Sequence, residues 1–145
     1  MTRGGFFPLK VKVAALLTAV LLVLTCAHRT EAQNSGGDVF IPIAKYIQKG
    51  DADRLSAWFA KNLEIEIFGT ATECSCIQAT QIMKNFFSQY TPKSFSIIHK
   101  SGNPPMKYAI GTLNTGSENL RVVLLVRTNP DTPQILRIRI ERSSI

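Results

Sequence analysis

The pattern of apolar and polar residues predicts that regular structure begins near Asp38 with a short helix. Its apolar side chains recur every three or four positions, as one helical face requires: Ile41, Ile43, Tyr46 and Ile47. Pro42 falls in the first turn, where its missing N–H removes no hydrogen bond. Gly50 then supplies a residue that readily takes the left-handed conformation ending a helix.

A second helix and a first strand are expected next. Asp51 is a good N-cap, and three apolar residues follow it at helical spacing before Asn62 ends the helix: Leu55, Trp58 and Phe59. From Leu63 to Ile67, apolar and acidic residues alternate with a period of two, which is typical of a half-buried strand. Residues 69–74 are expected to form a loop.

The clearest helix of the chain is predicted to begin at Ser75. Ser75 and Gln78 have the spacing of a capping box, in which each side chain accepts a hydrogen bond from the backbone N–H of the other residue. Six apolar side chains form one stripe along this helix, which Pro92 ends: Ala79, Ile82, Met83, Phe86, Phe87 and Tyr90.

Beyond Pro92 the pattern changes to strands. Four are predicted, at residues 94–100, 107–113, 120–127 and 134–142, and short turn-rich segments separate them. Separators this short permit antiparallel neighbours and leave no room for crossover helices. We therefore expect an α+β domain in which three helices from the N-terminal half pack on one face of a curved, mainly antiparallel sheet.

Three stretches of the chain resemble a known architecture. They are DVFIPIAKYIQKGDADRLSAWFAKNLEIEIFG (38–69), QATQIMKNFFSQYTPKSFSIIHK (78–100) and YAIGTLNTG (108–116), with a weaker likeness in RVVLLV and ILRIRIE of the last strands. Their order resembles the nuclear transport factor 2-like, or cystatin-like, cone. It is more closely similar to a family of small exported bacterial proteins with that fold and no assigned function. The resemblance implies the fold but no chemistry, because this fold serves isomerases, dehydratases, accessory subunits and transport factors.

The start of the chain has the pattern of a secretory signal peptide. Basic residues precede an uncharged apolar run at residues 13–26, which is shorter than the roughly 20 residues that span a bilayer core. Small residues favour cleavage before Gln33, with cleavage after Ala27 as the second choice. Lipidation of Cys26 is an alternative that would attach the protein to a membrane.

The predicted organisation is therefore a signal peptide at residues 1–32, a flexible leader at 33–37 and one domain at 38–145. Such a protein would be periplasmic or secreted. The whole chain has a net charge of +7, but removing four basic residues and one acidic residue with the signal peptide leaves about +4. The remaining basic residues are scattered, so no nucleic-acid partner is expected.

Two features are candidates for chemistry. Cys74 and Cys76 precede the third helix, where they would form a strained disulfide or a redox pair, although an incidental loop pair is the simpler interpretation. His99 shares a strand face with Phe95 and Ile97 and is the one candidate for a catalytic base, although a solvated strand-end histidine is the simpler interpretation. No metal site or cofactor is expected, because a closed zinc site takes four ligands.

Other residues are candidates for binding. Those expected to line a pocket inside the cone are Tyr46, Trp58, Phe86, Tyr90, His99 and Tyr108. Four residues of the last two strands form a candidate face for an anionic ligand or acidic partner: Arg121, Arg127, Arg137 and Arg139. An ordinary charged outer sheet face is the simpler interpretation of these arginines. Glu64 and Glu66 share one face of the first strand and are expected to be solvent-exposed.

We therefore expect a non-catalytic exported domain that binds a ligand or another protein. A small apolar or anionic ligand and a homodimer formed through the sheet are the partners considered. The alternatives are a small lyase or isomerase with a pocket inside the cone, and a redox protein that uses the cysteine pair. A cone filled by Phe, Leu and Ile would favour the first, whereas a buried pocket holding a perturbed acid or base would favour an enzyme.

Overall fold

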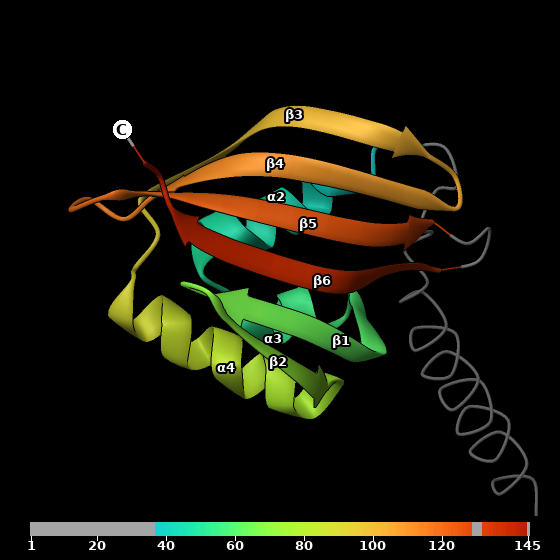
Figure 1. Cartoon of the computed structure of the whole chain (residues 1–145), viewed down its shortest axis with the longest axis horizontal. Helices are drawn as coiled ribbons and strands as arrows, with labels where there is room; N and C mark the ends of the chain where they lie inside the picture. Colours follow the sequence, from blue (N-terminus) through green and yellow to red (C-terminus); the bar gives the residue numbers. More distant parts are fainter. Residues whose placement is uncertain (1–36, 129–131, 145) are drawn as a thin grey trace, which may run out of the picture. The chain divides into compact units, whose positions relative to one another are not determined.

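The computed structural model describes residues 37–128 and 132–144. In chain order its elements are α2 (Phe40–Lys49), α3 (Ala52–Ser56), β1 (Phe59–Ile67), β2 (Thr70–Ser75), α4 (Cys76–Gln89), β3 (Ser94–Asn103), β4 (Met106–Asn114), β5 (Asn119–Thr128) and β6 (Pro133–Arg142) (Figure 1). The predicted signal peptide, its cleavage site and Cys26 lie outside the described residues.

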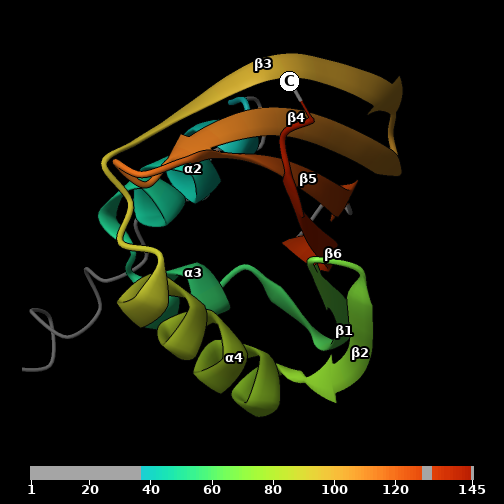
Figure 2. The same cartoon turned by 60° about the vertical axis from the view of Figure 1, so that its left-hand side comes forward.

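All the strands form one curved sheet, in the order β2-β1-β6-β5-β4-β3. Neighbouring strands are antiparallel, except that β1 runs parallel to β6. The three helices lie on the concave side, and the other side, which we call the outer face, carries no helix of the described chain (Figure 2). The predicted α+β fold with a curved, mainly antiparallel sheet is confirmed.

The capping box at the start of α4 is confirmed. The Ser75 hydroxyl accepts from the Gln78 backbone N–H at 3.3 Å, and the Gln78 side-chain oxygen accepts from the Ser75 N–H at 3.0 Å. The helix presents four buried residues to the rest of the domain: Ala79, Met83, Phe86 and Phe87. The capping box therefore sets the start of this helix, and the spacing of its apolar residues sets the side that faces the core.

The predicted second helix is too long by more than a turn. Asp51 caps α3 by accepting from the Arg54 N–H at 3.0 Å, but the helix ends at Ser56 and β1 begins at Phe59. The Ile135 N–H donates to the Trp58 carbonyl at 2.6 Å, and Phe59 is in register with Ile135 in β6. Pairing with a distant strand therefore overrides the helical spacing of these residues.

The loop predicted at residues 69–74 is instead the edge strand β2, which pairs with β1 as a hairpin. Phe68 and Gly69 form its turn with φ of 51° and 88°, the positive values that tight hairpins need. A phenylalanine in this conformation costs about 1–2 kcal/mol. Its ring lies 5.3 Å from the Tyr90 ring, and the Arg142 guanidinium lies 4.0 Å from its centre. These contacts offset the backbone strain. The sequence around Phe68 contains no turn motif that predicts this hairpin.

The buried face of α2 differs from the predicted one by one residue. Ile43 and Ile47 are buried as expected, but Ile41 is 66% exposed and Phe40 takes its place in the core. The buried face of the helix is formed by Phe40, Ile43 and Ile47, which have helical spacing. Gly50 ends the helix with φ of 62°, as predicted.

Candidate functional site

The space between the helices and the sheet is filled by apolar side chains. No polar or charged residue in the described part of the chain is buried. The largest fully buried side chains include Phe40, Leu55, Met83, Leu124 and Ile138, which come from the helices and from the central strands. Packing of this kind is that of an ordinary core.

The six predicted pocket residues do not gather around a hollow. Phe86 is part of the core, and three others are half-buried and packed against it: Tyr46, Trp58 and Tyr90. Tyr108 and His99 are exposed on strands of the sheet. None of the six lines either of the two surface hollows described below.

The predicted position of His99 inside the cone is wrong. The β3–β4 register shifts between Ile97 and His99, so a bulge breaks the alternation that would have placed His99 beside Phe95. His99 pairs with Ile110 and is exposed, with its ring 6.0 Å from the Tyr108 ring. Phe95 remains buried. The bulge therefore moves His99 away from the core side of the sheet.

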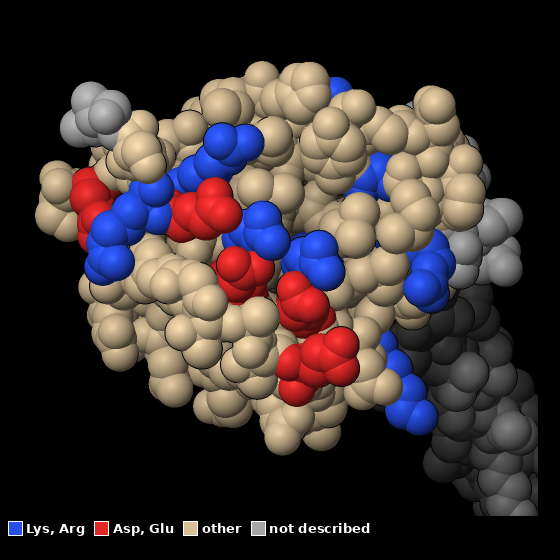
Figure 3. All heavy atoms as spheres, viewed as in Figure 1, with Lys and Arg blue, Asp and Glu red and all other residues tan. Residues whose placement is uncertain are grey.

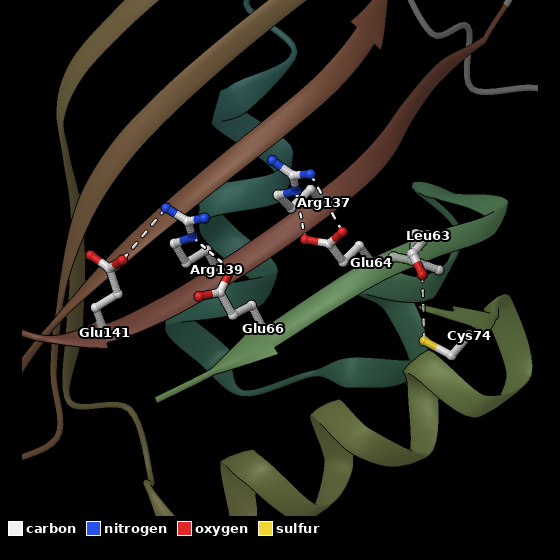
Figure 4. Close-up of polar contacts among 7 residues, drawn as sticks. All are labelled: Leu63, Glu64, Glu66, Cys74, Arg137, Arg139 and Glu141. Atoms are coloured by element: carbon white, nitrogen blue, oxygen red, sulfur yellow. Dashed lines mark hydrogen bonds and ion pairs between the residues drawn. The ribbon is translucent and has the colours of Figure 1, made fainter. Parts of the chain in front are cut away.

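The two cysteines are free thiols with separate surroundings. Cys74 is buried, and its Sγ lies 3.6 Å from the Leu63 carbonyl oxygen (Figure 4). Cys76 is half-buried, with its Sγ 3.6 Å from the Ser56 carbonyl oxygen. Burial raises the pKa of the Cys74 thiol. A reactive thiol needs the opposite shift, so these surroundings favour the incidental pair over a redox pair.

The outer face of β1 and β6 carries a row of ion pairs, which we call the charge ladder (Figure 4). Arg137 Nε lies 2.8 Å from Glu64 Oε1, and Arg139 Nε lies 2.8 Å from Glu66 Oε2. Arg139 Nη1 also lies 3.7 Å from Glu141 Oε1. The pairs form because parallel β1 and β6 place Glu64 against Arg137 and Glu66 against Arg139. The hydrogen bond to Glu66 raises the pKa of Arg139 above its ordinary value.

The ladder changes the prediction of a cationic face. Arg137 and Arg139 are each paired with a carboxylate, so they do not form a row of unpaired positive charges. The glutamates are also less exposed than expected, with 24% of the Glu64 side chain and 17% of the Glu66 side chain accessible. Arg121 is exposed on β5 and forms no ion pair within the described residues. These ion pairs depend on the parallel pairing of β1 with β6, which the local sequence pattern does not indicate.

Beside the ladder lies a band of apolar side chains, which we call the outer strip: Tyr108 and Ile110 of β4, Val123 and Leu125 of β5, and Leu136 of β6. Tyr108 is in register with Leu125, and Ile110 with Val123. Leu125 pairs with Arg137 and Val126 pairs with Ile135, so β6 has a bulge in which Leu136 is left between two paired positions. These side chains are accessible at the surface, next to the charged row visible in Figure 3. Contiguous accessible apolar residues bordered by charges are typical of protein interaction sites.

A shallow hollow of about 270 Å³ lies where the strip meets the ladder. It is lined by Leu125 and Leu136 of the strip and by Glu64 and Arg137 of the ladder, together with Asn62 and Glu73. Glu64 and Glu73 are directly opposite across β1 and β2, so this border of the outer face carries excess negative charge. A second hollow of about 220 Å³ lies at the hairpin tip beside Phe68 and Arg142. None of the helices in residues 37–128 and 132–144 is long and apolar enough to cross a membrane.

Comparison with known proteins places the fold. The sequence profile of DUF4783, described as a domain of unknown function, matches residues 40–141. A DUF4783 family protein from Bacteroides uniformis is 23% identical, with a TM-score of 0.70 over 74% of this chain and 100% of that one. Another from Bacteroides ovatus is 23% identical, with a TM-score of 0.68 over 72% of this chain and 96% of that one.

More distant structures share the same architecture. A protein of the NTF2-like family from Streptomyces avermitilis is 11% identical, with a TM-score of 0.54 over 72% of this chain and 90% of that one. No curated protein matches the chain. The predicted resemblance to the nuclear transport factor 2-like fold is therefore confirmed, and these similarities concern the fold alone.

Proposed function

The chain belongs to the DUF4783 family of domains of unknown function, so its role must be inferred from its own residues, and we propose a non-catalytic interaction module. Its binding surface is the outer face of the sheet, formed by the outer strip and the charge ladder. The observation that carries this proposal is the contrast between an interior packed with apolar side chains and an outer face that leaves apolar residues accessible.

The interior supports a non-catalytic role. Enzymes that act on small molecules place a catalytic acid or base in an enclosed pocket, where burial shifts the pKa of that group. In the described residues no ionisable side chain other than the thiol of Cys74 is buried, and burial shifts the pKa of that thiol away from reactivity. His99, the candidate base, is exposed on an edge strand. These positions favour the binding module over the lyase or isomerase alternative.

The outer face supports a macromolecular partner rather than a small ligand. The larger hollow is shallow and open at the surface, whereas small-molecule sites enclose most of their ligand. The outer strip extends over three adjacent strands, and charged residues border it. An apolar centre with a polar rim is the arrangement found in protein interfaces.

The proposal predicts which surface of the chain contacts another macromolecule in living cells. A photoactivated amino acid at position 125, in the outer strip, is expected to form covalent adducts in the native host. The same amino acid at position 77 of α4 is the matched control, because Ile77 is 79% exposed and lies on a helix away from the outer face. Adducts from position 77 alone, or from neither position, would contradict the proposal. Adducts are resolved by electrophoresis and identified by mass spectrometry.

We also propose export, which the pattern of the first 32 residues supports. The protein recovered from its native host is expected to begin at Gln33, as measured by intact mass and N-terminal sequencing. A chain that begins at His28 would place cleavage after Ala27. A chain that begins at an acylated Cys26 would identify a lipoprotein, and an uncut chain beginning at Met1 would contradict the signal peptide.

A further inference from the structure

The two edge strands of the sheet differ in regularity. β2 and β3 are the outermost strands, so each has one side without a neighbouring strand in the described part of the chain. The unpaired N–H and C=O groups of such an edge can bind another chain unless the strand is interrupted. Two irregularities interrupt β3: its register with β4 shifts between Ile97 and His99, and Gly102 has a φ of 91°. The exposed Lys100 protects this edge further.

β2 lacks these interruptions. Its register with β1 runs without a shift from Thr70 to Ser75, and the strand contains neither lysine nor proline. Residues 70–73 are exposed, and two of these four are threonines, which favour strands. Figure 2 shows β2 at one end of the curved sheet. β2 is therefore the edge that is able to accept a further strand.

The alternation of hydrogen bonds identifies the free backbone groups of β2. Successive residues of a strand direct their N–H and C=O groups to opposite sides. The Phe68 N–H donates to a carbonyl of β6 at 2.9 Å, so every second residue of β1 before Phe68 also faces β6. Ile65 has the opposite parity and therefore faces β2, where it is in register with Thr72. It follows that Ala71 and Glu73 direct their N–H and C=O groups away from β1, toward the open edge.

The side chains next to this edge favour a basic partner. Arg137, Glu64 and Glu73 form one row across β6, β1 and β2. Arg137 pairs with Glu64 at 2.8 Å, whereas Glu73 forms no ion pair within the described residues. Two carboxylates directly opposite each other are unfavourable, and Figure 3 shows acidic side chains gathered over β1 and β2. A positive charge on the other side of Glu73 would offset this repulsion.

We propose that the open edge of β2 binds an extended segment of another protein as a seventh strand of the sheet, with a lysine or arginine next to Glu73. Backbone hydrogen bonds to Ala71 and Glu73 hold the segment, and the ion pair selects its sequence. The hollow of about 270 Å³ beside Glu64 and Glu73 has room for the basic side chain. An acidic segment would be repelled. Because this surface is the edge of the sheet and not the outer strip, the inference goes beyond the proposed function and does not depend on it.

Two fluorescent peptides test the proposal on protein purified after expression of the full chain. One alternates threonine with lysine and the other alternates threonine with glutamate, so each places its charges on one face of a strand. We expect the lysine peptide to bind at least about tenfold more tightly, as measured by fluorescence anisotropy. Amide hydrogen exchange followed by NMR should slow at Ala71 and Glu73 when this peptide binds, because their N–H groups gain acceptors.

Three variants separate strand addition from simple attraction of charges. Ala71→Pro removes a free N–H of the edge without removing a hydrogen bond to β1, and it should weaken binding of the lysine peptide at least about tenfold. Glu73→Lys should reverse the preference, so that the glutamate peptide binds more tightly. Glu118→Lys is the matched control, because it makes the same charge change in the turn between β4 and β5 and should leave the preference unchanged.

Several outcomes would overturn the proposal. A lysine peptide that does not bind, or that binds no better than the glutamate peptide, is one of them. Another is binding that Ala71→Pro leaves unchanged, because attraction to Glu73 alone would explain it. Slow exchange at positions 71 and 73 in the protein alone, increasing with its concentration, would assign the edge to a second copy instead. Circular dichroism verifies the fold of each variant, and Glu73→Lys changes an exposed residue, so it keeps the test valid if Ala71→Pro fails to fold.

Discussion

Replacing Gly111 with alanine is expected to destabilise the domain markedly, although it adds a single methyl group. A Cβ at this position would lie 2.4 Å from Cζ and 2.5 Å from Cε2 of the Phe95 ring. It would also lie 3.0 Å from the backbone oxygen of Ser96 in the neighbouring strand. Overpacking of this kind costs about 1–3 kcal/mol, and we expect the upper part of that range. Urea denaturation of the domain measures it.

A double variant shows whether the ring is the cause. Phe95→Ala alone leaves a cavity and is expected to cost about 3–5 kcal/mol, because the ring is buried. Combined with Gly111→Ala, it removes the clash, so the double variant should be clearly more stable than the sum of the two losses predicts. Strictly additive losses would show that the methyl group does not contact Phe95.

Replacing Phe86 with alanine is expected to lower the free energy of unfolding by about 3–5 kcal/mol. Phe86 is buried on α4, and its ring lies 5.0 Å from the Tyr90 ring and 5.7 Å from the Phe87 ring. Truncation leaves a cavity between these aromatic residues. Chemical denaturation monitored by circular dichroism measures the loss, and the result decides between a core position and the lining of an open pocket.

Tyr90→Phe is the matched control for this substitution. It keeps the aromatic ring and removes a hydroxyl that lies 3.5 Å from Arg142 Nη2 at the surface. The expected loss is below about 1 kcal/mol, because the bond is long and solvent-accessible. A loss for Phe86→Ala as small as that of the control would mean that Phe86 faces an open space.

Local sequence patterns predicted the elements whose structure depends on nearby residues. The α4 helix begins at its capping box and buries four of the six residues of the predicted stripe, and the turn-rich separators marked the strands β3 to β6. The predictions that were wrong concern residues whose conformation depends on a contact with a distant part of the chain. Trp58 and Phe59 have helical spacing, but hydrogen bonding to Ile135 makes them the start of a strand. Phe68 takes a turn conformation that its type disfavours, held by Tyr90 and Arg142.

The amino-acid sequence by itself determined the fold class, the order of most elements and the apolar side of α4, because side-chain periodicity and helix caps act over a few residues. The tertiary structure decided which charges meet. Glu64 and Arg137 are far apart in the chain, and they become partners only because β1 and β6 lie side by side and parallel. The single-residue bulge that turns His99 away from the core side likewise depends on pairing with β4. The candidate surface is therefore a property of strand pairing, which a local pattern does not encode.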